Sequence, residues 1–365
     1  MKVHVLDPPA YTPPYDHALC AALAAEGLDV ELYTSAFPYA ELPPPDGYRR
    51  REFFYRHARG PAGSQTQRAT RLVEHVPDMA RYRAAARAAD VVHVQWLALG
   101  ALDGLLLPRR RPLVLTAHEI LPAQAPRLRR EAQRRLYASF DAVIAHSQAS
   151  RARLISELSL DPARVHTIPH GAFAHLAATA PAPLPGELGT PSGPVVLYFG
   201  LIRPYKGLEV LLDAWRGGFD DAELWIVGRP RFDITALRAG AGPGVRWVPR
   251  FVGDGELAAC FRRADLVVLP YREIEESGVL ATALAFGSAL ILSDTGGFRE
   301  VAAAGAAALV PPGDPAALRA AVRELLDDPG ARRRLSDAAS TLAAGAASWP
   351  QVAAQTRALY QTLVS

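Results

Sequence analysis

The stretch VVLYFGLIRPYKGLEVLLDAW, residues 195–215, decides the fold of this chain. A run of apolar residues, the pattern of a buried strand, ends at Gly200. A short loop then presents Arg203 and Lys206, and Gly207 leads into a helical pattern with apolar residues three and four apart. Arginine can engage two phosphate oxygens at once, and lysine adds a point charge. The stretch therefore predicts a diphosphate site at the carboxyl end of a strand; the alternative is a basic surface loop that contacts only solvent.

The amino-acid composition gives Lys206 added weight. Lys2 and Lys206 are the only lysines in 365 residues, and arginine is used wherever else a cation other than histidine occurs. A compact ammonium at this position indicates a site that a planar guanidinium would not fit.

The same strand–loop–helix rhythm runs through the rest of the chain. In the first half the expected strands are VHVLDPP, DVELYTS, VVHVQWL, PLVLTAH, AVIAHS and VHTIPHG, and in the second half the series runs from VVLYFG to AALVPP. Alternating strands and helices predict parallel sheets with helices on both faces. We therefore expect an α/β fold with two Rossmann-like domains that face each other across a cleft, with ligands at the carboxyl ends of the strands.

A segment rich in proline and glycine, with little apolar periodicity, predicts the domain boundary. We expect an N-terminal domain at residues 1–180, a linker at 181–194 and a C-terminal domain at 195–348. Residues 349–365 form an amphipathic helical pattern, which we expect to pack back on the N-terminal domain.

Composition and charge exclude several classes of protein. A net charge of +3 is too small to indicate nucleic-acid binding, and no run of 18 apolar residues indicates a membrane span. Cys20 and Cys260 form neither a disulfide framework nor a metal site, and no cluster has the spacing of metal ligands, so we expect no metal. Without a leader pattern, the expected location is the cytoplasm.

A second loop, in PYREIEESGVLATALAFG at residues 270–287, has the features of an anion site. Ser277 is a credible N-cap, and the first amides of the helix that follows would point at an anion. Three glutamates lie just ahead of it, where carboxylates can accept hydrogen bonds from sugar hydroxyls: Glu273, Glu275 and Glu276. The alternative is that these glutamates only favour the helix N-terminus through its dipole.

On these residues the sequence resembles glycosyltransferase family 4. The resemblance is carried by FGLIRPYKGLEVLL, by DLVVLPYREIEESGVLATALAFGSALILSDTGGFREV, and by the order of the flanking elements; it covers the C-terminal half well and the N-terminal half loosely. It implies a GT-B fold and a retaining, metal-independent transfer of a sugar from a nucleotide-diphosphate donor, with a UDP-sugar favoured over a GDP-sugar. The C-terminal domain would bind the donor, and the N-terminal domain the acceptor.

The resemblance also assigns roles to residues of the C-terminal half. It implies that Arg203 and Lys206 bind the donor pyrophosphate together with the amides near Gly278 and Val279, and that the acidic loop holds the sugar. The full expected donor set is Gly200, Arg203, Lys206, Glu273, Glu276, Ser277, Gly278, Val279 and Thr282. The expected catalytic set is His118, Arg203, Lys206 and Glu275.

The acidic loop departs from the family pattern at one point. Many members carry two glutamates seven residues apart, the second of which contacts the ribose. Alignment of the segments puts Thr282 at the second position and Ile274, flanked by the three glutamates, at the first. A threonine hydroxyl can still bond a ribose hydroxyl, but more weakly than a carboxylate. Which of the three glutamates contacts the sugar stays open.

The N-terminal half offers a histidine and a loop. His118, in TAHEILP, follows an expected strand and matches the place where family members often have a histidine that faces the transferred sugar; the alternative is a strand-end histidine bonded to backbone. We interpret His170 as part of a turn, and His93 and His146 as structural. The expected acceptor residues are Tyr15, Asp16 and His17, at the start of the first helix.

Three further readings stay open at this stage. The segment RLRREAQRR, residues 127–135, forms a basic amphipathic helix that can touch anionic lipid or can simply be a solvated face, so the expected location includes the inner face of a membrane. A nucleotide-sugar 2-epimerase, or a non-catalytic binding module of the same fold, is an alternative to a transferase. A nicotinamide dehydrogenase is disfavoured, because VLDPPAYTPP lacks the Gly-x-Gly-x-x-Gly turn.

Overall fold

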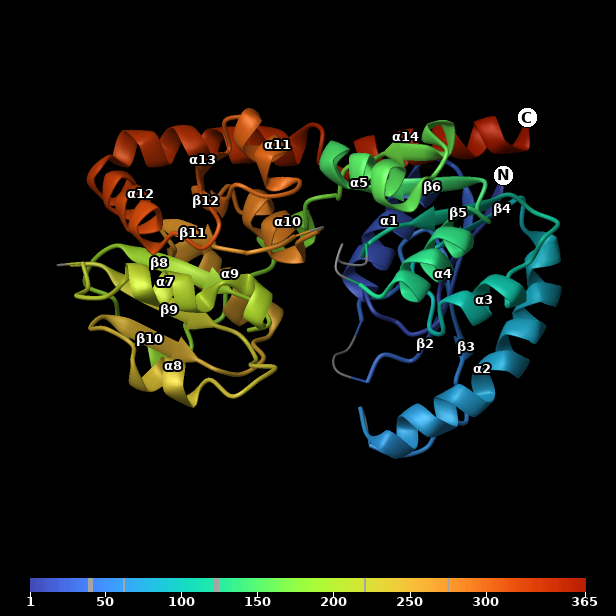
Figure 1. Cartoon of the computed structure of the whole chain (residues 1–365), viewed down its shortest axis with the longest axis horizontal. Helices are drawn as coiled ribbons and strands as arrows, with labels where there is room; N and C mark the ends of the chain where they lie inside the picture. Colours follow the sequence, from blue (N-terminus) through green and yellow to red (C-terminus); the bar gives the residue numbers. More distant parts are fainter. Residues whose placement is uncertain (39–41, 62, 121–124, 220, 275) are drawn as a thin grey trace. The chain divides into compact units, whose positions relative to one another are not determined.

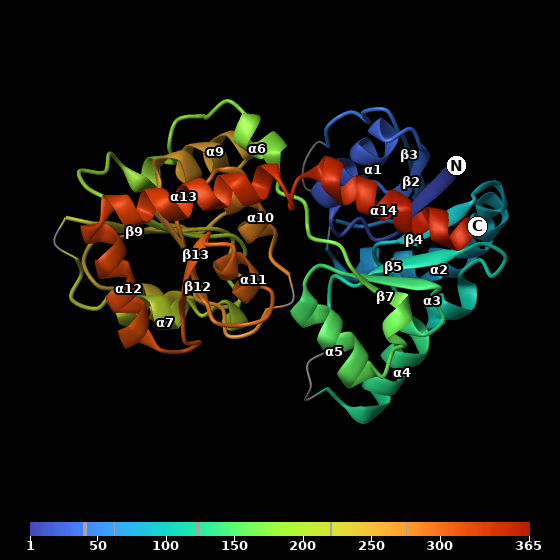
Figure 2. The same ribbon diagram turned by 90° about the horizontal axis from the view of Figure 1, so that it is seen from above.

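The computed structural model describes residues 1–38, 42–61, 63–120, 125–219, 221–274 and 276–365 (Figures 1 and 2). The chain divides into two compact units. The first comprises residues 1–171 and 349–365, and the second comprises residues 172–348. Each unit is built on one parallel sheet, which confirms the predicted α/β class with two Rossmann-like sheets.

The first unit contains a seven-stranded sheet in the order β3-β2-β1-β4-β5-β6-β7. The strands are β1 (Lys2–Asp7), β2 (Asp29–Ser35), β3 (Arg49–Phe54), β4 (Val91–Val94), β5 (Leu113–Thr116), β6 (Ala142–Ala145) and β7 (Val165–Thr167). Its helices are α1 (Pro13–Ala25), α2 (Gln65–Ala85), α3 (Ala101–Leu106), α4 (Arg127–Tyr137), α5 (Gln148–Leu158) and α14 (Trp349–Val364), with short 3₁₀ turns η1 (Ala86–Ala88) and η2 (Pro162–Arg164).

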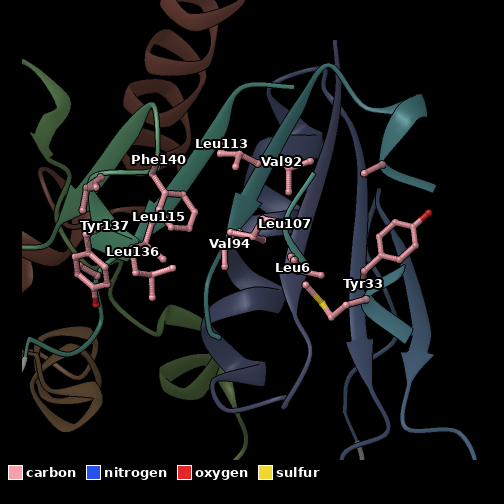
Figure 3. Close-up of a cluster of buried hydrophobic side chains, with 14 of the residues drawn as sticks. Leu6, Tyr33, Val92, Val94, Leu107, Leu113, Leu115, Leu136, Tyr137 and Phe140 are labelled. Carbon is pink, nitrogen blue, oxygen red and sulfur yellow. The ribbon is translucent and has the colours of Figure 1, made fainter. Parts of the chain in front are cut away.

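Alternation along the strands assigns the helices to two faces of this sheet. Leu6, Val94 and Leu115 point into a core that α2, α4 and α5 complete (Figure 3). On the opposite face His93 reaches α14, where its Nδ1 lies 2.6 Å from Tyr360 Oη. The C-terminal helix α14 thus belongs to the first unit, where it lies along α1 (Figure 2).

The second unit contains a six-stranded sheet in the order β10-β9-β8-β11-β12-β13. The strands are β8 (Val195–Phe199), β9 (Glu223–Val227), β10 (Val245–Val248), β11 (Leu266–Leu269), β12 (Leu290–Ser293) and β13 (Ala307–Val310). The helices are α6 (Ala174–Ala178), α7 (Leu208–Ala214), α8 (Thr235–Ala239), α9 (Asp254–Arg263), α10 (Gly278–Ala285), α11 (Phe298–Ala303), α12 (Pro315–Asp327) and α13 (Pro329–Ala344), with turns η3 (Gly186–Leu188) and η4 (Pro204–Lys206).

The boundary between the units lies at Gly171, before the segment 181–194 that we expected to be the linker. That segment belongs to the second unit because its backbone and one of its two leucines are used there. Leu188 is buried, and Arg263 donates to the carbonyl of Gly193. The high proline and glycine content of segment 181–194 therefore belongs to an ordered turn of the second unit, and not to a linker between the two units.

In each sheet the strand order reverses at the first strand of the unit. In the first unit β1 lies between β2 and β4, and in the second unit β8 lies between β9 and β11. In parallel sheets of this kind, ligands bind outside the carboxyl ends of the strands at that reversal. The loops after β8 and β11 in the second unit, and those after β1 and β4 in the first, are therefore the places to look for sites.

Candidate active site

In the second unit, the loop after β8 and the start of α10 lie against each other. Gly200 has φ +102°, and a Cβ there would lie 2.7 Å from Val279 Cγ2 and 3.4 Å from Lys206 Nζ. Gly207 has φ +64°, and a Cβ there would lie 1.9 Å from the carbonyl oxygen of Pro270. Both glycines are needed for the close approach, which brings Gly200, Lys206 and Val279 around one small space, as the sequence predicts.

Lys206 is the central charge of this arrangement. Its side chain is only 7% exposed, and its Nζ lies 5.0 Å from the ring centroid of Tyr271, which follows β11. Within the described residues Lys206 takes part in no ion pair. A buried ammonium is costly without a counter-charge, and a cation–π contact compensates for only part of that cost. The site therefore has a positive charge that an anionic ligand would satisfy.

Arg203 lies three residues before Lys206 and is exposed. It is the residue before η4, and its backbone is extended, with φ −133° and ψ 152°. The loop itself is held by Arg272, whose backbone N–H donates to the Tyr205 carbonyl at 2.8 Å and whose side chain pairs with Glu209 at 2.7 Å. Arg203 is thus an exposed cation, whereas Lys206 is a buried one.

The N-terminus of α10 supplies amides to the same region. Ser277 is its N-cap, as predicted, and Ser277 Oγ accepts from the N–H of Leu280 at 3.2 Å. Gly278 is exposed and Val279 is half-buried, so the first turn is not closed off by side chains of the described residues. Backbone N–H groups at a helix start favour an anion.

Thr282, the expected ribose contact, lies one turn further along α10. Its side chain is buried, and its hydroxyl donates to the carbonyl of Gly278 at 2.8 Å. The hydroxyl hydrogen is therefore used inside the helix, and what remains for a ligand is the acceptor capacity of the oxygen.

The acidic loop lies between β11 and α10. Glu273 is exposed and Glu276 is half-buried, while Glu275, which we expected in the catalytic set, lies outside the described residues. The loop after β12 packs against the acidic loop: Gly296 has φ +49°, and a Cβ there would lie 2.6 Å from the carbonyl oxygen of Ile274. The pair of glycines in SDTGG was the sequence signal for this contact, and Tyr271 and Gly296 are site residues that the sequence analysis missed.

In the first unit, three histidines follow three neighbouring strands and surround one tyrosine. His118, His146 and His170 come after β5, β6 and β7. Their ring centroids lie 4.9, 5.5 and 4.9 Å from that of Tyr15 on α1. We had separated these histidines into one site residue, one structural residue and one turn residue, whereas parallel pairing brings all three to one edge of the sheet.

His118 is fixed on two sides. Trp96 stacks on it with the rings 9° from parallel and 5.1 Å apart, and Gln95 Oε1 lies 3.0 Å from His118 Nε2. Trp96 is in turn held by its Nε1, which donates to Thr12 Oγ1 at 2.8 Å. Such an imidazole is oriented before any ligand arrives, which is what a polar contact to a sugar requires.

The three residues that we expected to face the acceptor have different surroundings. Asp16 is 1% exposed and lies beside Asp7, which corrects our expectation that its carboxyl faces an acceptor. Burial raises the pKa of both carboxyls, and the charge of Asp7 further raises the pKa of Asp16. Tyr15 is buried among the histidines, and His17 Nδ1 lies 2.9 Å from Tyr48 Oη. Tyr15 and Asp16 are buried because the register of α1 turns positions 15 and 16 toward the sheet.

Comparisons with known proteins agree with this architecture. The family model described as "Glycosyltransferase Family 4" matches residues 15–172, and "Glycosyl transferases group 1" matches residues 193–328. A D-inositol 3-phosphate glycosyltransferase of Arthrobacter sp. (strain FB24) is 30% identical over 382 residues, covering 96% of this chain and 89% of its own. A phosphatidyl-myo-inositol mannosyltransferase of Mycobacterium leprae (strain TN) is 40% identical over 182 residues, 47% of this chain and 48% of its own.

Among solved structures, a sucrose-phosphate synthase from Thermosynechococcus elongatus superposes with a TM-score of 0.76 at 22% identity, covering 100% of this chain and 99% of its own. The fold is thus GT-B. The chain belongs to glycosyltransferase family 4, as the sequence motifs indicated. It is a glycosyltransferase of the hexosyltransferase type, which disfavours both the epimerase and the non-catalytic alternatives.

No helix within the described ranges is long and apolar enough to cross a membrane.

Proposed function

We propose that this transferase takes its sugar from a nucleoside-diphosphate sugar whose diphosphate binds in the second unit. The observation that carries the proposal is the buried ammonium of Lys206 beside Gly200 and Val279. Arg203 adds a second cation, and the amides at the start of α10 complete the set of donors. Cations and a helix N-terminus can stabilise the departing diphosphate as its charge develops, without a metal ion.

The transfer is proposed to retain the anomeric configuration, with the leaving phosphate accepting the proton of the acceptor hydroxyl. In this scheme no side chain serves as a dedicated base. In the first unit His118 offers an oriented imidazole for a hydrogen bond to a sugar hydroxyl. In the second unit the glutamates of the acidic loop offer acceptors for the hydroxyls of the transferred sugar. The prediction of UDP over GDP gains no support from the relative named a mannosyltransferase, so both nucleotides belong in the test.

For the acceptor we propose a hydroxyl of an inositol phosphate. The two relatives described above are named for D-inositol 3-phosphate and for phosphatidyl-myo-inositol, which share a phosphorylated cyclitol ring. The acceptor is assigned to the first unit, where aromatic rings and imidazoles meet at the ends of β5, β6 and β7. Rings of this kind pack on the apolar face of a cyclitol, while imidazole nitrogens bond its hydroxyls.

A product assay tests this function. The purified protein is incubated with UDP-glucose, UDP-N-acetylglucosamine or GDP-mannose, each with inositol 3-phosphate, with phosphatidylinositol, or without acceptor, and with or without EDTA. We expect a glycosylated inositol product from one donor, unaffected by EDTA, with the anomeric configuration of the donor by NMR. Conversion of the donor into its 2-epimer without acceptor would indicate an epimerase. Inhibition by EDTA, or a product with the inverted anomeric configuration, would contradict the proposed mechanism.

A further inference from the structure

Helix α2 of the first unit presents its apolar side chains outward. The side chains it buries are His75, Asp78, Met79 and Tyr82, two of them polar. The opposite face carries Leu72, Val73 and Val76, which are 55%, 77% and 44% exposed. Ala69, Pro77, Ala80 and Ala84 continue this stripe at helical spacing and are also exposed. A surface helix normally has the reverse arrangement, so the outward face of α2 calls for a partner.

The inward polar residues of α2 are fully used, which fixes the helix in this orientation. His75 is hydrogen-bonded to Asp103 of α3 and, through Nδ1 at 2.7 Å, to the hydroxyl of Tyr55. Asp78 accepts from the backbone N–H of Tyr55 at 2.7 Å. Rotation of α2 to bury its apolar stripe would break these buried bonds, so the stripe stays outside.

The neighbouring helices extend the apolar surface. Helix α3 lies between α2 and α4 (Figure 1), with Asp103 turned to α2 and Gly104 against Leu136 of α4. Its outward residues Leu102 and Leu105 are 41% and 63% exposed. Leu128, in the first turn of α4, is also exposed. We call the exposed apolar residues of α2, α3 and the first turn of α4 the α2–α4 surface.

This surface is strongly basic as well as apolar. Residues 64–88, 101–111 and 126–135 carry thirteen arginines and four carboxylates, a net charge of +9, whereas the whole chain has +3. The four carboxylates are engaged or buried in part: Asp78 pairs with Arg81, and Glu131 with Arg134 and Arg135. Exposed arginines flank the apolar stripe of α2, at Arg68 and Arg83. An apolar face bordered by arginine fits a surface that is apolar inside and anionic at its boundary.

We propose that the α2–α4 surface docks on an anionic lipid bilayer, with the apolar side chains in the acyl boundary and the arginines among the headgroups. A second copy of the chain is the other occupant to consider, but two surfaces of net charge +9 would repel each other. The proposal goes beyond donor and acceptor chemistry, and it adds the apolar face of α2 to the basic segment 127–135 that the sequence had indicated.

Sedimentation with vesicles tests the proposal. The protein is mixed with vesicles of phosphatidylcholine alone, or of phosphatidylcholine with one third phosphatidylglycerol. We expect binding to the anionic vesicles, weaker at high salt, and little binding to phosphatidylcholine. The variant carrying both Val73→Asp and Leu105→Asp should lose at least ~10-fold in partition, since two exposed apolar anchors are replaced by charges that the lipid repels.

Two controls keep the test sharp. Phe251 is 64% exposed in the second unit, so Phe251→Asp places one such negative charge on an exposed apolar residue outside the surface and should bind vesicles as the wild type does. The variant that carries both Arg68→Glu and Arg83→Glu changes only the charge of the surface and leaves the apolar stripe intact. It should bind anionic vesicles more weakly than the wild type. Calorimetric titration of nucleotide in free solution reports on the donor site separately, so failure of one proposal does not imply failure of the other.

Three outcomes would overturn the proposal: no binding of the wild type to anionic vesicles, equal binding of the Val73→Asp, Leu105→Asp variant, or equal loss in Phe251→Asp. A dimer in light scattering that the double variant dissociates, with the protein left in the supernatant of the vesicles, would assign the surface to a second copy of the chain instead.

Discussion

At the scale of single residues, glycines decide whether the two loops of the second unit can meet. Gly207 combines a left-handed backbone with a position from which any Cβ would enter the carbonyl of Pro270. Gly217 has a similar φ of +80°, but nothing within 4 Å of a Cβ placed there. The two positions therefore separate backbone strain from loss of the close approach.

We predict that Gly207→Ala is much more damaging than Gly217→Ala. The second substitution has only the left-handed strain, about 1–2 kcal/mol of unfolding free energy. The first must also move η4 away from the end of β11, and should abolish nucleotide binding. Urea unfolding and calorimetry of both variants test this, and equal losses of stability in the two would show that the approach of the loops is unimportant.

A buried histidine makes a second prediction at this scale, on pH. His4 is buried on β1 against Tyr33, with ring centroids 4.6 Å apart, and neither ring nitrogen has a hydrogen-bond partner among the described residues. Burial lowers the pKa of His4 from 6.5 to about 4. Between those values the unfolded chain binds a proton that the folded chain does not, so stability falls as the pH falls, by at most ~1.4 kcal/mol per pH unit for this group.

His4→Phe should remove this contribution. The variant should be at least as stable as the wild type at pH 7, because two buried nitrogens without partners are removed. Its unfolding free energy should fall less steeply between pH 6.5 and 4.5. Urea unfolding at several pH values in that window measures both slopes, and parallel curves for variant and wild type would refute the assignment.

At the scale of elements, the sequence predicted the buried strands and missed the elements that break the usual pattern. VVLYFG and PLVLTAH became β8 and β5, because short continuous apolar runs are typical of parallel strands that are buried on both faces. The strand β3, with sequence RRREFF, was not predicted: it is an edge strand whose arginines pair with Glu31 on β2, and only its last two residues, Phe53 and Phe54, are apolar. Helix α2 was not named from the sequence although its apolar residues recur at helical spacing, and the sequence could not show that this apolar stripe faces outward while His75 and Asp78 are buried.

The candidate site could likewise be predicted only in part. Residues adjacent in sequence, such as Arg203 and Lys206 or Ser277 and Gly278, were found because one loop or one helix start presents them together. The grouping of His118 with His146 and His170 was not, because it depends on the pairing order of β5, β6 and β7. Side-chain direction also escaped the sequence: the same helix that carries Tyr15 turns Asp16 into the unit.

Helix α14 gives a prediction at this scale. Its Tyr360 bonds His93, which in turn has Nε2 at 2.7 Å from Thr116 Oγ1, so one buried network ties the C-terminal helix to β4 and β5. Tyr360→Phe should lower the unfolding free energy by about 1–3 kcal/mol, because it leaves a buried ring nitrogen without its partner. Tyr198→Phe is the matched control: the Tyr198 hydroxyl is buried without a partner among the described residues, so its loss should cost little. Equal effects in urea unfolding would contradict the network.

At the scale of the whole molecule, one chain of family 4 combines two parallel sheets, for which we propose distinct tasks. In each sheet the reversal of strand order places the functional loops, and composition then differentiates them. The second unit has a buried lysine and an open helix start, suited to a diphosphate, and the first has aromatic rings and imidazoles, suited to a hydroxylated ring. The basic, apolar α2–α4 surface is confined to the first unit.

The central claim is that Lys206 binds the donor diphosphate, and calorimetric titration with UDP and GDP tests it most directly. We predict binding of one nucleotide with a Kd on the order of micromolar, weakened at least ~10-fold in Lys206→Ala, which corresponds to ~1.4 kcal/mol. Lys2→Ala removes the other lysine, which pairs with Glu31 at 2.9 Å in the first unit, and should bind as the wild type does. Undiminished binding in Lys206→Ala, or no binding of either nucleotide to the wild type, would contradict the claim.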